Sequence, residues 1–299
     1  MPFLQLTLDI GKADPEPFED ALFAMGATSV TLQDSADDPI LEPAPGATPL
    51  WPTITMKALF ASDANKDQIT AALSEEVGVI PHHRFEHVED RVWEREWLKD
   101  FKPMLFGRRL WVCPGGMLPP ANLLPVPSAP SPELCLVHLD PGLAFGTGTH
   151  PTTAMCLEWL DGANLEGRTM IDYGCGSGIL AIAALKLGAA RAVGVDIDPQ
   201  AVTATEDNAR RNGIGANLIV QLVSAPLAVA DVLFANILAG PLDELGPTLA
   251  SLVRPGGDLV LSGILKDQAA HLAQRYAAWF DMEAPVFNGD WAKLVGRKR

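Results

Sequence analysis

Alternating apolar and polar positions predict strands in the first third of the chain, with helical patterns between them. The strand pattern occupies residues 3–10, 28–33, 54–60 and 84–89. Two helices are predicted, one starting after Asp14 and ending at Gly26, the other capped by Asp63 and ending at Gly78. The resulting order, β-α-β-β-α-β, is the ferredoxin-like pattern and indicates a small α+β domain over residues 1–90.

Residues 91–106 combine charged and aromatic side chains and predict a linker helix. Trp93, Trp97 and Phe101 recur at helical spacing. Their rings are expected to pack against one domain, and a hinge that lets the small domain move is the alternative interpretation. Residues 114–132 are rich in Pro, Gly and Ala and predict a loop between two strands.

From residue 134 onwards, short apolar runs alternate with helical patterns. Strands are predicted at 134–139, 169–173, 192–196, 218–223, 232–235 and 258–262, with helices at 152–160, 179–187, 199–212, 241–252 and 266–278. A last hairpin is expected between 282–287 and 291–296. Strands that alternate with helices favour an α/β fold with a doubly wound, mostly parallel sheet, here in a domain over residues 107–299.

Composition places the chain among globular proteins. Its 299 residues are 48% hydrophobic and 20% charged, which suits two domains with sizeable cores. No apolar run reaches the roughly 18 residues of a membrane span, and the first residues lack the pattern of a secretory signal. The cysteines form no C-x-x-C pair, which argues against a zinc site or a disulfide framework and predicts a reducing cytoplasm; they are Cys113, Cys135, Cys156 and Cys175.

The net charge of −15 is distributed unevenly along the chain. Residues 1–90 hold 16 Asp and Glu against 4 Lys and Arg, a net of −12, whereas residues 91–299 hold 21 against 18, a net of −3. Such a chain lacks the Lys and Arg that grip a phosphate backbone, so we expect no direct nucleic-acid partner. The acidic first domain suits a basic protein partner, and a solvated surface without a partner is the alternative.

The strongest chemical motif joins a predicted strand to a predicted helix and reads Asp172-Tyr-Gly174-Cys-Gly176-Ser-Gly178. Glycines at alternate positions let the backbone turn sharply and let a ligand approach closely. The next strand ends at Asp196, 18 residues past Gly178, where a carboxylate can accept both hydroxyls of a ribose. The pattern predicts a nucleoside site at this edge of the sheet.

Two features separate this glycine turn from a dinucleotide site. Its spacing is G-x-G-x-G rather than G-x-G-x-x-G, which opposes an NAD-dependent dehydrogenase, one alternative function. Asp172 leads into the turn, where a carboxylate would repel a pyrophosphate but suits an ammonium or a sulfonium ion. The motif D-x-G-x-G-x-G resembles the first motif of class I methyltransferases, which use S-adenosylmethionine. The turn from Arg254 to Asp258 resembles the one before their fifth strand.

A polar loop precedes the helix predicted at 152–160. It reads Asp140-Pro-Gly-Leu-Ala-Phe145-Gly146-Thr147-Gly-Thr149-His150-Pro-Thr-Thr153. Thr149 or His150 can cap the helix, and Pro151 suits its first position. The hydroxyls and the free helix N–H groups predict a loop that folds over the cofactor and binds its carboxylate; a simple capped loop is the alternative.

A third predicted strand ends at Asn236, in the segment Asn236-Ile-Leu-Ala. An amide at this edge accepts a hydrogen bond from an amine and donates one to a carbonyl. Methyltransferases of planar amides or base amines often carry Asn-Pro-Pro-Tyr here, and this chain lacks that aromatic platform. The segment therefore favours an aliphatic amine over a nucleobase as the acceptor, and an asparagine that only starts a helix is the alternative.

Segments 140–153, 172–180 and 236–241 together closely resemble the PrmA family, the methyltransferases of ribosomal protein L11, and the resemblance spans essentially the whole chain. It implies methylation of lysine side chains and of the N-terminal amine of that protein, with S-adenosylmethionine as the methyl donor and no metal. The resemblance implies cofactor contacts from Thr153, Gly174, Asp196 and Asn236, with Phe145, Thr147 and Thr149 in the loop over the cofactor. We expect Gly146, Asp172 and Gly176 to belong to the same site. Because no His/carboxylate pair lies near the motifs, Asn236 is the candidate catalytic residue, which would orient the amine without a dedicated general base.

The resemblance also implies a division of labour between the two predicted domains. The small domain would recognise the protein substrate, free of the ribosome, and the linker would reposition it. We expect a monomer, because no heptad or interface stripe is evident. A methyltransferase for another protein or for a nucleic-acid amine, and a binding module without activity, are the remaining alternatives.

Overall fold

The computed structural model describes residues 2–36, 40, 49–89, 102–120, 134–139 and 148–299. The chain divides into two compact units, Met1–Glu96 and Trp97–Arg299. Most of the segment predicted as a linker helix, with Trp93, Trp97 and Phe101, lies outside the described residues. Over those residues, no helix is long and apolar enough to cross a membrane.

The first unit is an antiparallel sheet of four strands with two helices. Its elements follow one another as β1 (Phe3–Gly11), α1 (Glu16–Ala24), β2 (Ser29–Asp34), β3 (Ile54–Ala61), α2 (Lys66–Val77) and β4 (His83–Val88). The strands lie in the order β2-β3-β1-β4. Alternate residues of β1 and β3, such as Leu4, Leu6, Met56 and Phe60, are buried against both helices. The ferredoxin-like fold stays our interpretation of this order of elements.

The two helices of the first unit begin differently from each other. The Asp14 carboxylate accepts a hydrogen bond from the Glu16 N–H at 3.1 Å, which closes the turn into α1. The prediction that Asp63 caps α2 is wrong, because Asn65 holds that position and accepts from the Asp67 N–H at 2.9 Å. A cap must directly precede the first helical residue, and Asp63 lies too early in the chain.

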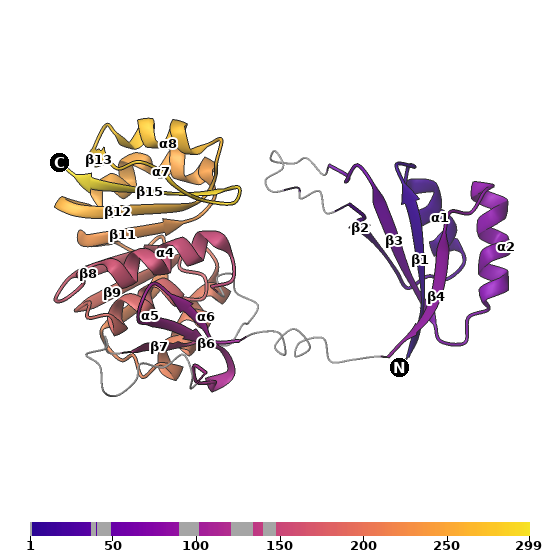
Figure 1. The fold of residues 1–299 in the computed structure, drawn as a ribbon, viewed down its shortest axis with the longest axis horizontal. Helices are drawn as coiled ribbons and strands as arrows, with labels where there is room; N and C mark the ends of the chain where they lie inside the picture. The colour runs from indigo at the N-terminus through magenta and orange to yellow at the C-terminus, as the bar shows by residue number, and fades with distance from the viewer. Residues whose placement is uncertain (1, 37–39, 41–48, 90–101, 121–133, 140–147) are drawn as a thin grey trace. The chain divides into compact units, whose positions relative to one another are not determined.

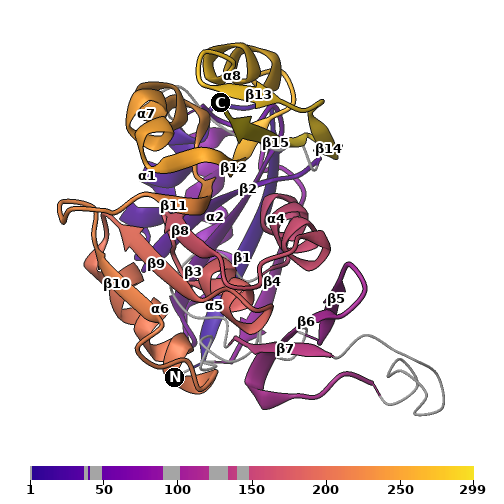
Figure 2. The ribbon, with the colours of Figure 1, turned by 90° about the vertical axis from the view of Figure 1, so that its left-hand side faces the viewer.

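The second unit is built on an eight-stranded sheet, whose strands follow one another across Figures 1 and 2. Its strands are β8 (Thr169–Tyr173), β9 (Arg191–Asp196), β10 (Leu218–Leu222), β11 (Ala230–Asn236), β12 (Val253–Leu265), β13 (Phe280–Met282), β14 (Val286–Asn288) and β15 (Trp291–Lys298). The order is β10-β9-β8-β11-β12-β15-β13, and β14 pairs with β15 as the predicted hairpin. Strands β8 to β12 run parallel, and β15 runs antiparallel to β12. This confirms the doubly wound α/β sheet.

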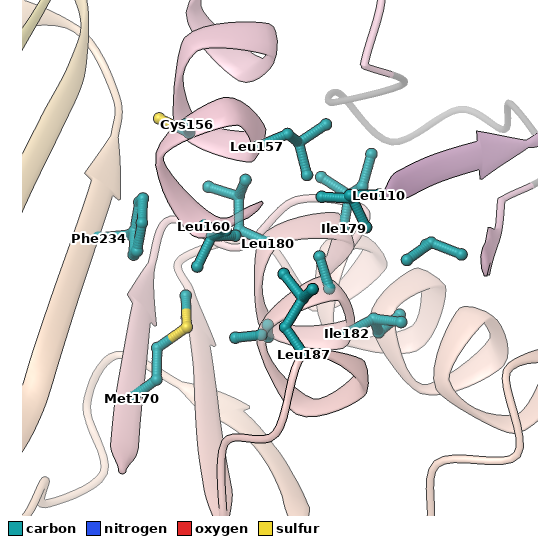
Figure 3. Close-up of a cluster of buried hydrophobic side chains, with 14 of the residues drawn as sticks. Leu110, Cys156, Leu157, Leu160, Met170, Ile179, Leu180, Ile182, Leu187 and Phe234 are labelled. Carbon is teal, nitrogen blue, oxygen red and sulfur yellow. The ribbon is translucent and has the colours of Figure 1, made fainter. Parts of the chain in front are cut away.

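Helices cover both faces of this sheet. They are α4 (Pro151–Gly162), α5 (Ile179–Lys186), α6 (Pro199–Arg211), α7 (Ala239–Ser251) and α8 (Ala269–Tyr276). Because successive strand residues point to opposite faces, Met170 and Phe234 pack with α4 and α5, whereas Ile171 and Leu233 pack with α7 and α8. Figure 3 shows the first of these clusters, where Leu157 of α4 lies near Ile179 of α5.

A separate three-stranded sheet precedes α4, visible apart from the large sheet in Figure 2. It contains β5 (Met104–Phe106), β6 (Leu110–Cys113) and β7 (Cys135–His138), with the 3₁₀ turn Pro114–Gly116 after β6. Two predictions are corrected here. Residues 134–139 do not join the large sheet, because β7 pairs with β6 and is fastened to the C-cap of α6, where the Asn212 amide donates to the His138 carbonyl at 2.6 Å. Residues 104–106 form a strand rather than the end of the linker helix.

Candidate functional site

The glycine turn connects β8 to α5 and is bonded to the neighbouring strand β9. Gly174, Gly176 and Gly178 all have positive φ angles, of 79°, 54° and 76°. The Gly174 and Cys175 N–H groups donate to the Val195 carbonyl at 2.8 and 3.0 Å. This turn therefore has the conformation that requires glycine, at the carboxyl edge where doubly wound sheets bind ligands.

Residues from two other elements leave no room for a side chain in this turn. A Cβ atom at Gly174 would overlap the Ile237 side chain, and one at Gly178 would lie 2.5 Å from the Thr205 methyl group. The Thr205 hydroxyl donates to the Gly176 carbonyl at 3.0 Å. The sequence prediction missed Ile237 and Thr205. No local pattern singles out Thr205, because the buried face of α6 carries a second polar residue, Asn208.

Asp196 ends β9 as predicted, and the backbone holds its carboxylate in place. One oxygen accepts from the Gly176 N–H at 2.9 Å, and the other accepts from the Asp198 N–H at 3.1 Å. A carboxylate oxygen can accept a second hydrogen bond, so both retain capacity for hydroxyl donors. The structure thus places Asp196 against the glycine turn, where a diol would find two acceptors.

Asp172 is the buried carboxylate of the site, with 1% of its surface exposed. One oxygen accepts from the Ala181 N–H, in the first turn of α5, at 3.1 Å. The other oxygen has no hydrogen-bond partner among the described residues. Burial disfavours the charged form and raises the pKa of Asp172 to about 7, the Ala181 bond opposes this, and the nearby charge of Asp196 adds to it. A cation beside the unpartnered oxygen would restore the ionised form.

Of the two predicted caps of α4, Thr149 and His150, the structure has His150. Its Nδ1 lies 3.4 Å from the Thr152 N–H, which donates to it, and 2.7 Å from the Thr152 hydroxyl. An N–H donor at Nδ1 requires the lone pair of that nitrogen, which fits the tautomer with its proton on Nε2. The His150 ring packs edge-on against the Trp291 ring, with 4.6 Å between the ring centroids. Burial lowers the pKa of His150. These contacts confirm that His150 caps the helix.

Asn236 and Thr153 meet at the carboxyl edge of the sheet. The Asn236 amide donates from Nδ2 to the Thr153 hydroxyl at 3.3 Å. Its Oδ1 is buried and has no hydrogen-bond partner within the described part of the chain. Thr153 itself is buried in the first turn of α4. The structure therefore brings two of the predicted site residues into contact and leaves the Asn236 Oδ1 acceptor without a hydrogen-bond partner among the described residues.

Several residues predicted for the cofactor site and the acidic loop lie outside the described part of the chain. Phe145, Gly146 and Thr147 lie outside the described residues, as do Asp37 and Asp38 of the acidic loop. Thr149 is described and exposed, just before His150. Over the described ranges, no group of three or more His, Cys, Asp or Glu side chains could hold a metal ion.

The chemistry of these groups fits S-adenosylmethionine. That molecule carries a sulfonium, an ammonium and a ribose diol. Asp172 and Asn236 each present an unpartnered buried oxygen, which suits positively charged or N–H groups, and Asp196 offers acceptors for the diol. The carboxylate site expected at the start of α4 is not shown, because Pro151 has no N–H and the N–H groups of Thr152 and Ala154 already donate to His150, to its Nδ1 and its carbonyl.

The fold and the site together define a Rossmann-like class I methyltransferase. The family described as ribosomal protein L11 methyltransferase (PrmA) matches residues 2–299. The chain therefore belongs to the ribosomal protein L11 methyltransferase (PrmA) family.

Relatives support this membership along the whole chain. The "Ribosomal protein L11 methyltransferase" of Pseudomonas paraeruginosa (strain DSM 24068 / PA7) is 52% identical over 302 residues, which cover 100% of this chain and 99% of the relative. That of Serratia proteamaculans (strain 568) is 48% identical over 303 residues, which cover 100% of both. A crystal structure of ribosomal protein L11 methylase from Lactobacillus delbrueckii subsp. bulgaricus is 33% identical, with a TM-score of 0.58 and coverage of 67% of this chain and 100% of that one.

Proposed function

We propose that this protein methylates ribosomal protein L11 with S-adenosylmethionine, on lysine side chains and on the N-terminal amine. The observation that carries the proposal is the Asn236–Thr153 contact at the sheet edge, with Asn236 Oδ1 left unpartnered in a buried position. The relatives named for L11 methylation match over the whole chain, which supports the substrate.

The cofactor would be held by residues from three strand ends and from α4. The glycine turn would allow the cofactor to approach closely, and Asp172 would balance its positive charge. Asp196 would accept from the ribose hydroxyls, and Thr153 would bind the cofactor from α4. S-adenosylmethionine would supply an electrophilic methyl group on sulfur. By resemblance to the family, Phe145, Gly146, Thr147 and Thr149 would complete the site.

The acceptor amine must lose a proton before it reacts. A free lysine has a pKa of about 10.4, so at pH 7 only about one molecule in a few thousand is neutral, which costs about 4 to 5 kcal/mol. Desolvation and a nearby positive charge both lower the pKa of an amine. We propose that Asn236 Oδ1 accepts an N–H of the amine and aims its lone pair at the methyl carbon. His150 is no base here, since its Nδ1 already accepts from Thr152.

The first unit is proposed as the recognition domain for the protein substrate. Residues 1–90 would recognise the substrate, the linker would end before β5 at Met104, and residues 107–299 would catalyse the reaction. The net charge of −12 over residues 1–90 suits a basic ribosomal protein, taken up before it is buried against RNA. We propose that the enzyme acts as a monomer, without direct nucleic-acid contact, in a reducing cytoplasm, consistent with its four free cysteines.

The decisive assay supplies tritiated S-adenosylmethionine with purified large-subunit proteins and, separately, ribosomal RNA. Label on L11 alone is expected. Label on RNA would favour the nucleic-acid alternative, and label on no substrate would contradict the proposal.

Substrate docking has its own test. Neutralising Asp34, Asp37 and Asp38 together is expected to weaken capture of L11 and to flatten its dependence on salt. The matched control neutralises exposed Asp207 and Asp281 in the second unit, where capture should stay unchanged. If the variant neutralised at Asp34, Asp37 and Asp38 captures L11 as well as the control variant and the wild type do, the acidic residues have no role in docking.

A further inference from the structure

Two strands on one side of Asn236 also send polar side chains to the first turns of α4. The Ser262 hydroxyl, in β12, lies 3.3 Å from the Thr152 carbonyl and 3.3 Å from the Ala292 carbonyl, so its single hydrogen is shared between them. The Lys293 ammonium, in β15, donates to the Met155 carbonyl at 3.0 Å. The carbonyls of Thr152 and Met155 already lie in a helix, so their own backbone does not require these extra donors.

Lys293 occupies an unfavourable environment for a charged group. Only 7% of its surface is exposed. Burial lowers the pKa of the Lys293 amine, and the charges of Glu158 and Glu283 act on it in the opposite direction. Neither carboxylate forms an ion pair with it in the described part of the chain. A buried ammonium with one carbonyl partner reduces the stability of the fold compared with an apolar side chain of similar size.

The carbonyls of Thr152 and Met155, which accept from Ser262 and Lys293, lie close in sequence to the site residue Thr153. Thr152 and Met155 flank Thr153, whose hydroxyl receives the Asn236 amide. Strands β11, β12 and β15 are consecutive neighbours in the sheet, and each contributes one of the three side chains. Side chains from three neighbouring strands thus bond to the first two turns of α4, at Thr152, Thr153 and Met155, and Thr153 is the one that contacts Asn236.

We propose that Lys293 and Ser262 are positioning residues for cofactor binding: they hold the first turn of α4 where the Thr153 hydroxyl meets the Asn236 amide. The proposal rests on the proposed function, because Thr153 is taken to contact S-adenosylmethionine. A side chain that lowers stability where it lies is typical of functional sites, and the site is the feature that Lys293 holds in place.

The same strand offers a matched control. Lys298 also belongs to β15 and donates from its ammonium to a helix carbonyl, that of Ala250 in the last turn of α7, at 3.1 Å. Burial lowers the pKa of the Lys298 amine as well. It makes the same kind of bond as Lys293, but to a helix turn that holds no site residue.

The experiment measures S-adenosylmethionine affinity by calorimetry and the melting temperature of the cofactor-free protein for four full-length variants. K293M is expected to weaken the affinity at least five-fold while the melting temperature stays equal or rises. K293R, which keeps a donor, should stay within two-fold of the wild type. S262A should weaken the affinity at least two-fold, and K298M should change it less than two-fold.

A fifth comparison tests the route through Thr153. In a T153V background, K293M should weaken the remaining affinity less than two-fold, because the hydroxyl that Lys293 positions is already missing. The proposal is overturned if K293M binds S-adenosylmethionine as tightly as the wild type does, or if K293M and K298M lose the same affinity. If K293M does not fold, an unchanged affinity of S262A overturns it. Loss of cofactor binding in the wild type would instead contradict the proposed function.

Discussion

The Asn236 amide and the Thr153 hydroxyl, 83 positions apart in the chain, lie 3.3 Å from each other. The bond uses the donor side of the amide and leaves Oδ1 buried without a partner among the described residues. A buried acceptor without a partner costs free energy in the free protein. An N–H group placed beside Asn236 Oδ1 would therefore recover this free energy.

Replacement of Asn236 should affect turnover more than stability. N236A removes the acceptor proposed to orient the amine, and we expect kcat to fall by about 10² to 10³, the range seen when one oriented polar group is lost from an active site. N236D keeps the shape and the acceptor oxygens but loses the donor to Thr153. Steady-state kinetics at saturating cofactor and protein substrate measure both. Full turnover of N236A would show that Asn236 orients nothing in the reaction.

The buried carboxylate of Asp172 should make the stability of the cofactor-free protein depend on pH. The pKa of Asp172 is about 7 when folded, above its value of 3.8 in the unfolded chain, so the folded state holds a proton that the unfolded state releases. Its contribution to stability is complete below pH 3.8 and is lost as the pH rises through about 7. D172N should flatten the unfolding free energy over this window in denaturant titrations.

The same carboxylate should release a proton when a cation binds. Near pH 6.5, S-adenosylmethionine binding is expected to release up to about one proton, because a positive ligand favours ionised Asp172. Calorimetry in buffers with different ionisation enthalpies measures the number. The release should vanish in D172N and persist in H150S, which removes the other titrating group near the site. Identical release in wild type and D172N would assign the proton elsewhere.

The bounds of the strands around this site were easier to predict from the sequence than their pairing in the sheets. Strand β8 has the predicted bounds, Thr169–Tyr173, because an apolar run ends there in a glycine turn. Residues 134–139 form a strand as predicted, yet in another sheet, because a strand pattern does not specify which neighbour completes its hydrogen bonds. The hairpin at the end of the chain was predictable because its two strands are close in sequence.

The site residues divide in the same way. The positions of Asp172, Asp196 and Asn236 at the sheet edge were predictable, because Asp196 and Asn236 end strands, Asp172 is one residue from the end of β8, and the ends of parallel strands share one edge of the sheet. Their hydrogen-bond partners depend on packing between distant segments. The contact of Gly178 with Thr205 and the bond from Lys293 to Met155 therefore carry no signal in the local pattern.

The cap of α4 should weaken in acid. The folded pKa of His150 is lowered by burial below the 6.5 of an unfolded histidine, so the unfolded state takes up a proton first. The stability contributed by neutral His150 is present above pH 6.5 and is lost as the pH falls through the folded pKa. Denaturation of the second unit, followed by tryptophan fluorescence between pH 5 and 8, measures this loss. H150S should remove this pH dependence yet keep a cap, and H150A should be about 1 kcal/mol less stable than H150S at pH 8. The same acid sensitivity in H150S would place its origin in another group.

The glycine turn should tolerate a methyl group worse than an open turn with the same backbone conformation. Gly178 and Gly213 have φ angles of 76° and 66°, but a Cβ atom at Gly178 lies 2.5 Å from the buried Thr205 side chain, whereas one at Gly213 meets no atom within 4 Å. Both alanine variants incur the strain of a positive φ, about 1 to 2 kcal/mol. G178A should lose about a further 1 to 3 kcal/mol from overpacking. It should also weaken S-adenosylmethionine binding, because Thr205 holds the Gly176 carbonyl. Denaturant unfolding and calorimetry compare the two variants, and equal losses of stability in G178A and G213A would show that Thr205 moves aside freely.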